Sequence, residues 1–134
     1  MRLFVSVPTM GRSDEEVEAV KQDALRRVRE TLDPSATLTD SYFREDAPAE
    51  LYGDRIGIWY LGESLKRLAE SETAFFADGW EAARGCRIER AVCEAYGVGI
   101  LDTPLLERWA EKRKQEEWTR HESGVDPCPG GDAP

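Results

Sequence analysis

Apolar positions along this chain follow two alternating patterns, short continuous runs and longer stretches with helical spacing. The first run, Leu3–Val7, is typical of a buried strand. Ser13 and Glu16 then form a capping box, and apolar residues recur at helical spacing from there to Leu32. The same patterns predict further strands over residues 36–40, 73–77 and 98–101, and further helices over residues 58–70, 84–96 and 104–121.

Strands that alternate with helices at this spacing predict a parallel sheet with helices on both faces. Because crossovers between parallel strands are right-handed, we expect a small α/β sandwich of three layers, flavodoxin-like or Rossmann-like, with about four to five strands. Ligands of such folds bind beyond the carboxyl ends of the strands. The loops predicted there are residues 8–12 and residues 78–83, and residues 41–55 form a further long loop.

The pattern indicates one domain over residues 1–121 and a disordered tail, rich in glycine and proline, over residues 122–134. The last helix carries five basic and five acidic residues over positions 107–122. It is therefore expected to be solvated along most of its length. The alternative is a dimer contact that uses Trp109 and Trp118.

Composition adds a strong acidic bias. The 134 residues include 18 Lys and Arg against 27 Asp and Glu, which gives a net charge of −9. An acidic surface repels phosphate backbones, so duplex nucleic acid is not an expected partner. No apolar run approaches the about 20 residues of a membrane helix, and the amino terminus lacks the apolar segment of a signal peptide. We therefore expect a cytoplasmic protein with no membrane partner.

The cysteines and the histidine indicate neither a disulfide nor a metal site. Cys86 and Cys93 are seven positions apart in a predicted helix. Their Cα atoms are then roughly 10 Å apart, too far for a disulfide. Cys128 lies in the predicted tail, and His121 is the single histidine. Because no paired cysteine motif is present either, we expect no metal and interpret the thiols as structural or incidental.

The densest group of chemical candidates lies in residues 78–89, DGWEAARGCRIE, which run from a strand end through a loop into a helix. At 100° per residue, we expect this helix to bury Ile88, Ala91, Val92 and Ala95 and to point Arg87, Arg90 and Glu94 to solvent. Glu89 falls at the margin of the apolar face, and Gly85, one turn earlier, removes bulk over its carboxylate. A half-buried carboxylate beside such a notch is a candidate nucleophile or base. Arg84, expected on the inward side of the first turn, is a candidate anion ligand together with the helix terminus.

Each candidate also has an ordinary structural interpretation. A glutamate at a helix edge is usually solvated or paired with a cation, so the pattern alone does not make Glu89 catalytic. Asp78 can simply cap a turn, and Trp80 can belong to the core. The loop from Ser6 to Arg12 matches neither a P-loop nor a dinucleotide fingerprint. An ordinary strand-to-helix turn is the simpler interpretation of this loop, and no cofactor is expected.

The stretch SVPxxGR at residues 6–12 occurs here together with DGWExxRGCxxE at residues 78–89. This pairing resembles the nucleoside 2-deoxyribosyltransferase-like superfamily. More closely, it is similar to a branch of short bacterial and phage proteins known mostly as a domain of unknown function. The resemblance covers about residues 1–102, and the run from Trp80 to Glu89 is its most specific part.

The resemblance implies that Glu89 attacks the anomeric carbon of a deoxynucleoside and that Asp78 helps to hold the sugar or to position the leaving base. Gly85 matches a glycine that these enzymes commonly have four residues before the nucleophile. Contacts with substrate or its 5′-phosphate are implied for the other matched residues, Ser6, Pro8, Gly11, Arg12, Trp80, Glu81 and Arg84. The proton for the leaving base would come from Asp78 or Glu81.

Three functions stay open at this point. The first is an N-glycosidic enzyme, either a hydrolase or a deoxyribosyltransferase, acting on a nucleoside or a nucleoside monophosphate. The second is a non-catalytic module that binds or sequesters a nucleotide with Arg12 and Arg84. The third is an acidic interaction protein that mimics nucleic acid. Departures from the transferase pattern, Arg90-Ala91 after the nucleophile and Trp80-Glu81 before it, bear on this choice. The resemblance also implies a homodimer or a higher oligomer.

Overall fold

The computed structural model describes residues 1–39 and 46–123 and confirms the α/β sandwich. Four parallel strands form its sheet in the order β2-β1-β3-β4. Their bounds are β1 (Arg2–Ser6), β2 (Thr37–Leu38), β3 (Thr73–Phe76) and β4 (Gly99–Asp102). The chain passes from β1 to β2, which lies next to β1 on one side, and then from β2 to β3, which lies next to β1 on its other side. The carboxyl ends of β1 and β3 therefore flank the switch point, where ligands of such sheets bind.

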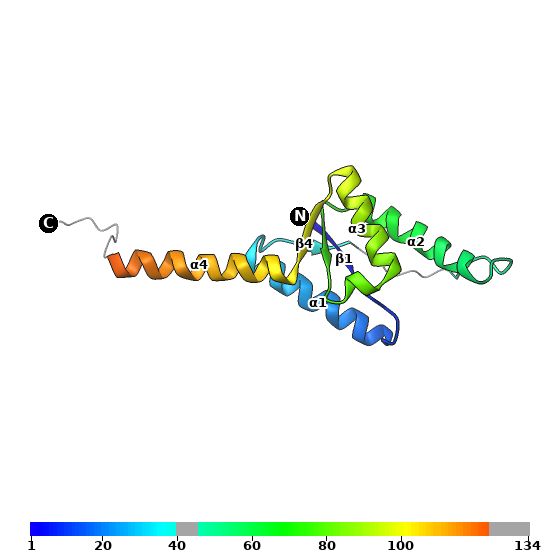
Figure 1. Ribbon diagram of the computed structural model, residues 1–134, viewed down its shortest axis with the longest axis horizontal. Helices are drawn as coiled ribbons and strands as arrows, with labels where there is room; N and C mark the ends of the chain where they lie inside the picture. Colours follow the sequence, from blue (N-terminus) through cyan, green and yellow to red (C-terminus); the bar gives the residue numbers. More distant parts are fainter. Residues whose placement is uncertain (40–45, 124–134) are drawn as a thin grey trace.

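Four helices and one short 3-10 turn complete the layers (Figure 1). Their bounds are α1 (Asp14–Thr31), α2 (Asp54–Ala69), η1 (Trp80–Ala82), α3 (Arg84–Tyr96) and α4 (Thr103–Ser123). α1 and α4 cover one face of the sheet, and α2 and α3 cover the other. The turn η1 lies between the end of β3 and the start of α3, beside the switch point.

Alternation along the strands sends side chains to two separate cores. In β1, Leu3 and Val5 belong to the core beneath α1 and α4, whereas Phe4 belongs to the core beneath α2 and α3. In β3, Phe75 and Phe76 divide between the two cores in the same way. Side chains at the carboxyl edge of the sheet therefore face one helical layer or the other.

Local sequence signals place most element boundaries. The predicted capping box is present, because Ser13 accepts from the Glu16 amide at 3.1 Å and the Glu16 carboxylate accepts from the Ser13 amide at 2.7 Å. Gly97 ends α3 in the left-handed region at φ +74°, as its position predicts. The prediction was less accurate for α2, which begins at Asp54 rather than at residue 58. The predicted strand at 36–40 is only two residues long within the described part of the chain.

α4 begins on the sheet and then leaves the body of the domain (Figure 1). Trp109 packs against the core beneath α1 and α4, whereas residues 111–120 are all exposed. Arg113 donates to the carbonyls of Glu30 and Thr31 at 3.1 and 2.6 Å and so caps the end of α1. The helix continues to Ser123, and the rest of the tail predicted to be disordered lies outside the described residues. Within residues 1–39 and 46–123, no helix has the length and apolarity needed to cross a bilayer.

Candidate functional site

A buried pair, Ser6 and Glu89, lies at the switch point. Ser6 is the last residue of β1 and is 2% exposed, and Glu89 in α3 is 7% exposed. The Ser6 hydroxyl donates to Oε1 of Glu89 at 2.6 Å, a length typical of a hydrogen bond to an ionised carboxylate. The resemblance named both residues, and the structure brings them together across 83 positions of sequence.

Burial dominates the electrostatics of Glu89. Desolvation raises the pKa of this carboxyl group above its ordinary value of 4.5, because the charged form loses hydration. Hydrogen bonds from the hydroxyls of Ser6 and of Ser64, on α2, act in the opposite direction, as does the positive charge of Lys21. A desolvated carboxylate held by hydroxyl groups is an arrangement suited to a nucleophile or a base.

Two free cysteines flank Glu89 on the same face of α3. Burial raises the pKa of the Cys86 thiol, and burial together with the charge of Glu89 raises the pKa of Cys93 to about 11. Both thiols are therefore protonated near neutral pH and are poor nucleophiles. The prediction that they form no disulfide with each other is confirmed, and Cys128 lies outside the described residues.

The predicted buried face of α3 was wrong for three of its four residues, because Ile88, Ala91 and Ala95 are exposed and only Val92 packs, partly buried, against the core. The buried residues of α3 are Cys86, Glu89 and Cys93. The helix lies close to the sheet at Ala74 and Phe76, and small thiols and a hydrogen-bonded carboxylate fit there. Positions 86, 89, 90 and 93 have the spacing of one helical stripe, but Glu89 and Arg90 are charged, so the apolar pattern of the sequence does not reveal it.

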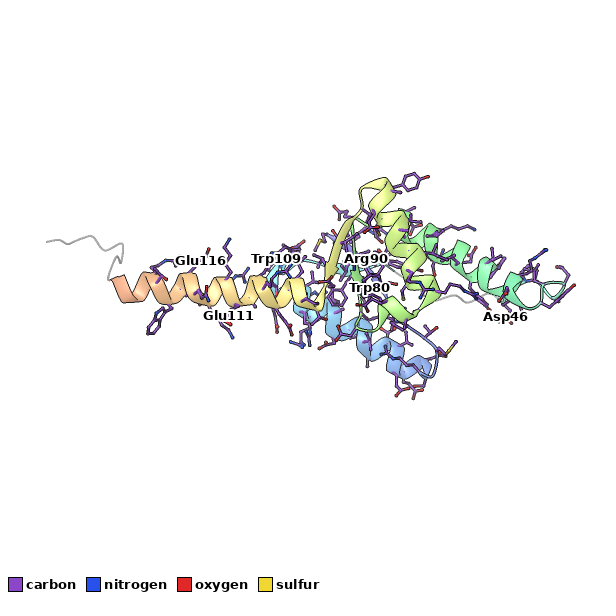
Figure 2. All side chains as sticks on the ribbon, in the orientation of Figure 1. Asp46, Trp80, Arg90, Trp109, Glu111 and Glu116 are labelled. Carbon is purple, nitrogen blue, oxygen red and sulfur yellow. The ribbon has the colours of Figure 1, made fainter. Side chains whose placement is uncertain are left out.

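The same stripe explains Arg90, whose predicted orientation to solvent was also wrong. Its guanidinium lies 4.2 Å from the ring centre of Trp80 and 5.3 Å from that of Phe76, and it pairs with Asp102 at 3.6 Å. Figure 2 shows Trp80 and Arg90 close together at the end of the sheet. The cation–π contact joins α3 to the η1 turn, and the ion pair joins α3 to the end of β4. Sequence reasoning missed Arg90 as a site-forming residue.

Arg12 and Asp78 lie on the other side of the carboxyl edge. They line a cavity of about 310 Å³ between α1 and the ends of β3 and β4, with Phe75 and Ala77 among its apolar lining residues. Glu89 is not among the residues that line this cavity. The sequence-predicted site thus divides into a Ser6–Glu89 group facing α2 and α3 and an Arg12–Asp78 group facing α1.

The loops that carry these two groups touch. A Cβ added at Gly79, which has φ +90°, would lie 3.7 Å from Cγ of Pro8. The loop after β1 therefore packs against the loop after β3. Gly11, at φ +80°, belongs to the turn in which the Arg12 amide donates to the Thr9 carbonyl at 3.1 Å.

The remaining predicted residues lie at the surface around the start of α3. Arg84 does not point inward as predicted; it is exposed and pairs with Asp54 of α2 at 3.5 Å. Glu81 is exposed, and its carbonyl accepts from the Arg87 side chain at 2.9 Å. Gly85 is also exposed, and a Cβ added there would meet no atom within 4 Å. The folded chain itself therefore does not require a glycine at this position.

Comparisons with profiles of known protein families, with curated proteins and with solved structures find no match for this chain. In the described part of the chain, no three histidine, cysteine, aspartate or glutamate side chains gather as a metal site would need. The geometry of the Ser6–Glu89 pair is therefore the main guide to chemistry.

Proposed function

We propose that this protein cleaves the N-glycosidic bond of a nucleoside or nucleoside monophosphate, with Glu89 as the nucleophile. The observation that carries the proposal is the buried carboxylate of Glu89, held at 2.6 Å by Ser6 at the switch point of a parallel sheet. The sequence resemblance adds support, because it places the nucleophile of the superfamily at this residue. Release of free base from deoxynucleosides and their monophosphates tests the proposal directly.

The chemistry proceeds through two displacements. An oxygen of ionised Glu89 forms a bond to C1′ of the sugar while the C1′–N bond breaks through an oxocarbenium-like transition state. The leaving base takes a proton from a general acid, for which the candidates are Asp78 and Glu81, two exposed carboxyl groups between β3 and α3. Water then attacks C1′ and frees Glu89, which gives hydrolysis; a second base attacking C1′ gives transfer.

The positions of the two arginines give less support to the nucleotide-sequestering alternative. Arg84 pairs with Asp54 on the side of α2. Arg12 lines the cavity on the side of α1. In the described structure, these two guanidinium groups therefore do not form one phosphate-binding site. Calorimetric binding of a nucleotide without release of base would favour the alternative.

Replacing Ser6 with Ala should shift the pH dependence of cleavage. The Ser6 hydroxyl lowers the pKa of Glu89, so its loss raises that pKa and leaves less of the nucleophile ionised. We expect the acidic limb of the kcat/KM profile to move to higher pH, with a larger loss of activity at pH 6 than at pH 8.

Thr39→Val is the matched control for Ser6→Ala. Thr39, just after β2, is also buried, and its hydroxyl bonds that of Ser71, just before β3, at 2.6 Å. Neither residue is among the groups that shift the pKa of Glu89. Both variants should lose about 1–2 kcal/mol of stability, but only Ser6→Ala should move the pH profile. Equal profiles for the two variants would show that Ser6 has a purely structural role.

Gly85→Ala tests whether the substrate uses the open space beside the start of α3. An added methyl meets no atom of the folded chain within 4 Å, so thermal stability should be unchanged or up to about 1 kcal/mol higher. If the sugar or base occupies this space, kcat/KM should fall about tenfold or more. Unchanged kinetics would place the substrate elsewhere.

A further inference from the structure

The cavity between α1 and the ends of β3 and β4 lies apart from the nucleophile of the proposed cleavage, because Glu89 is not among its lining residues. Its volume of about 310 Å³ is at the lower end of the range, about 300–1,000 Å³, that is typical of small-molecule sites. The cavity also lies at the carboxyl edge of a parallel sheet, where ligands of such folds bind. It therefore has the size and the place of a site for a small molecule.

Apolar side chains form one part of the cavity lining. Phe75 and Ala77 belong to β3 and the residue after it, and Ala19, Val20 and Ala24 belong to α1. An apolar group of a ligand loses its contact with water when it lies against such a surface, which favours binding. The cavity therefore suits a ligand that has an apolar part.

Four charged side chains form the other part of the lining, namely Arg12, Asp23, Arg27 and Asp78. Asp23 and Arg27 pair with each other at 3.0 Å. Within residues 1–39 and 46–123, the side chains of Arg12 and Asp78 form neither an ion pair nor a hydrogen bond. The cavity thus presents one unpaired cation and one unpaired carboxylate, which do not pair with each other.

The balance of these charges indicates the class of ligand. Two guanidinium groups and two carboxylates give 2 − 2 = 0. A phosphate or a nucleotide would meet the carboxylates of Asp23 and Asp78 on a chain whose net charge is −9. A ligand with positive charge alone would meet Arg12 and Arg27. A zwitterion avoids both conflicts, because it offers a carboxylate to Arg12 and an ammonium group to Asp78.

We propose that this cavity binds an α-amino acid with an apolar side chain. The carboxylate of the amino acid pairs with Arg12, its ammonium group pairs with Asp78, and its side chain lies against Phe75 and Ala77. With Asp78 engaged by the ammonium group, Glu81 is the remaining candidate for the general acid of the proposed cleavage. The binding itself does not depend on that cleavage, and Glu89→Gln should leave it unchanged.

NMR titrations of the full chain test the proposal with L-leucine, L-methionine and L-phenylalanine. At least one of them should bind and shift the amide signals of residues that line the cavity. For the tightest binder, the amide, which lacks the carboxylate, and the deaminated acid, which lacks the ammonium group, should each bind at least about tenfold more weakly. The proposal is overturned if none of the three amino acids binds at concentrations up to about 10 mM. It is also overturned if deoxyadenosine monophosphate binds more tightly at the same residues.

Two charge variants test how the ligand is oriented. Arg12→Gln and Asp78→Asn should each weaken binding of the amino acid by about tenfold or more, because each removes the partner of one charged group. The amide has no carboxylate for Arg12, so Arg12→Gln should weaken its binding by less than about twofold. Equal losses for the amino acid and its amide overturn the pairing of the carboxylate with Arg12. Glu15→Gln, which removes an exposed carboxylate of α1 outside the cavity lining, should bind like the wild type.

Ala19→Phe tests the location of the site without removing a charge. Ala19 is exposed and lines the cavity, so the larger side chain should occupy the cavity and abolish binding while the circular dichroism spectrum stays unchanged. Gln22→Phe is the matched control, because Gln22 is exposed on the same helix but does not line the cavity. It should bind like the wild type. Undiminished binding by Ala19→Phe overturns the assignment of the ligand to this cavity.

Discussion

Glu89→Gln is expected to reduce glycosidic cleavage by at least about 10³-fold while making the protein more stable at neutral pH. The loss follows because an amide cannot form the glycosyl–enzyme bond. The gain follows because burial raises the pKa of Glu89, so at neutral pH the fold holds a desolvated charge that the unfolded chain hydrates. Base release and thermal unfolding of the same two proteins measure both effects.

The stability difference between Glu89→Gln and wild type should depend on pH in one direction. The folded pKa lies above the unfolded pKa, so the folded state binds the proton more tightly. Wild-type stability therefore rises as the pH falls through the folded pKa, and the two proteins converge below about 4.5, the ordinary value for this group. At neutral pH the difference is about 1.4 kcal/mol for each unit by which burial raises the pKa.

Glu94→Gln is the control for these measurements, because it removes one exposed carboxylate from the same helix. It should change neither base release nor the stability at pH 7. Cleavage by Glu89→Gln at the wild-type rate would contradict the nucleophile assignment. A Glu89→Gln protein less stable than wild type at pH 7 would show instead that the ionised carboxylate stabilises the fold.

Arg90→Ala is expected to be the most destabilising change at a charged residue near the site, at about 2–3 kcal/mol. The guanidinium, with a side chain only 21% exposed, packs on Trp80 at 4.2 Å and pairs with Asp102 at 3.6 Å. Its removal leaves a cavity and an unpaired carboxylate. Asp102 also accepts from the Leu105 amide at 3.0 Å at the start of α4, so the loss reaches a second element. Thermal unfolding should show a decrease of roughly 5–10 °C.

Two variants separate the parts played by charge and shape at this position. Arg90→Lys keeps the charge but not the planar stacking, so an intermediate loss of about 1 kcal/mol is expected. Arg87→Ala removes an exposed arginine from the same helix and should cost less than about 1 kcal/mol. If Arg90→Ala is no more destabilising than Arg87→Ala, the stacked guanidinium contributes little to the fold.

The order of the elements and many of their ends follow from the sequence alone. Apolar runs long enough only for short strands, separated by helical periodicity, require a parallel sheet with crossovers. Local signals such as the Ser13–Glu16 capping box and Gly97 act within one or two turns, so their effect does not depend on the rest of the fold.

The buried side of each helix and the contacts between the candidate residues depend instead on how the elements pack together. Which face of α3 packs on the sheet depends on the space between the helix and the sheet. The small thiols and the hydrogen-bonded Glu89 occupy that space, whereas Ile88 is exposed. Ser6 meets Glu89 across 83 positions only because the two lie on one face of the sheet. Asp78 lines the cavity on the opposite face. Sequence patterns cannot give these contacts, because they arise from packing between segments that are far apart in the chain.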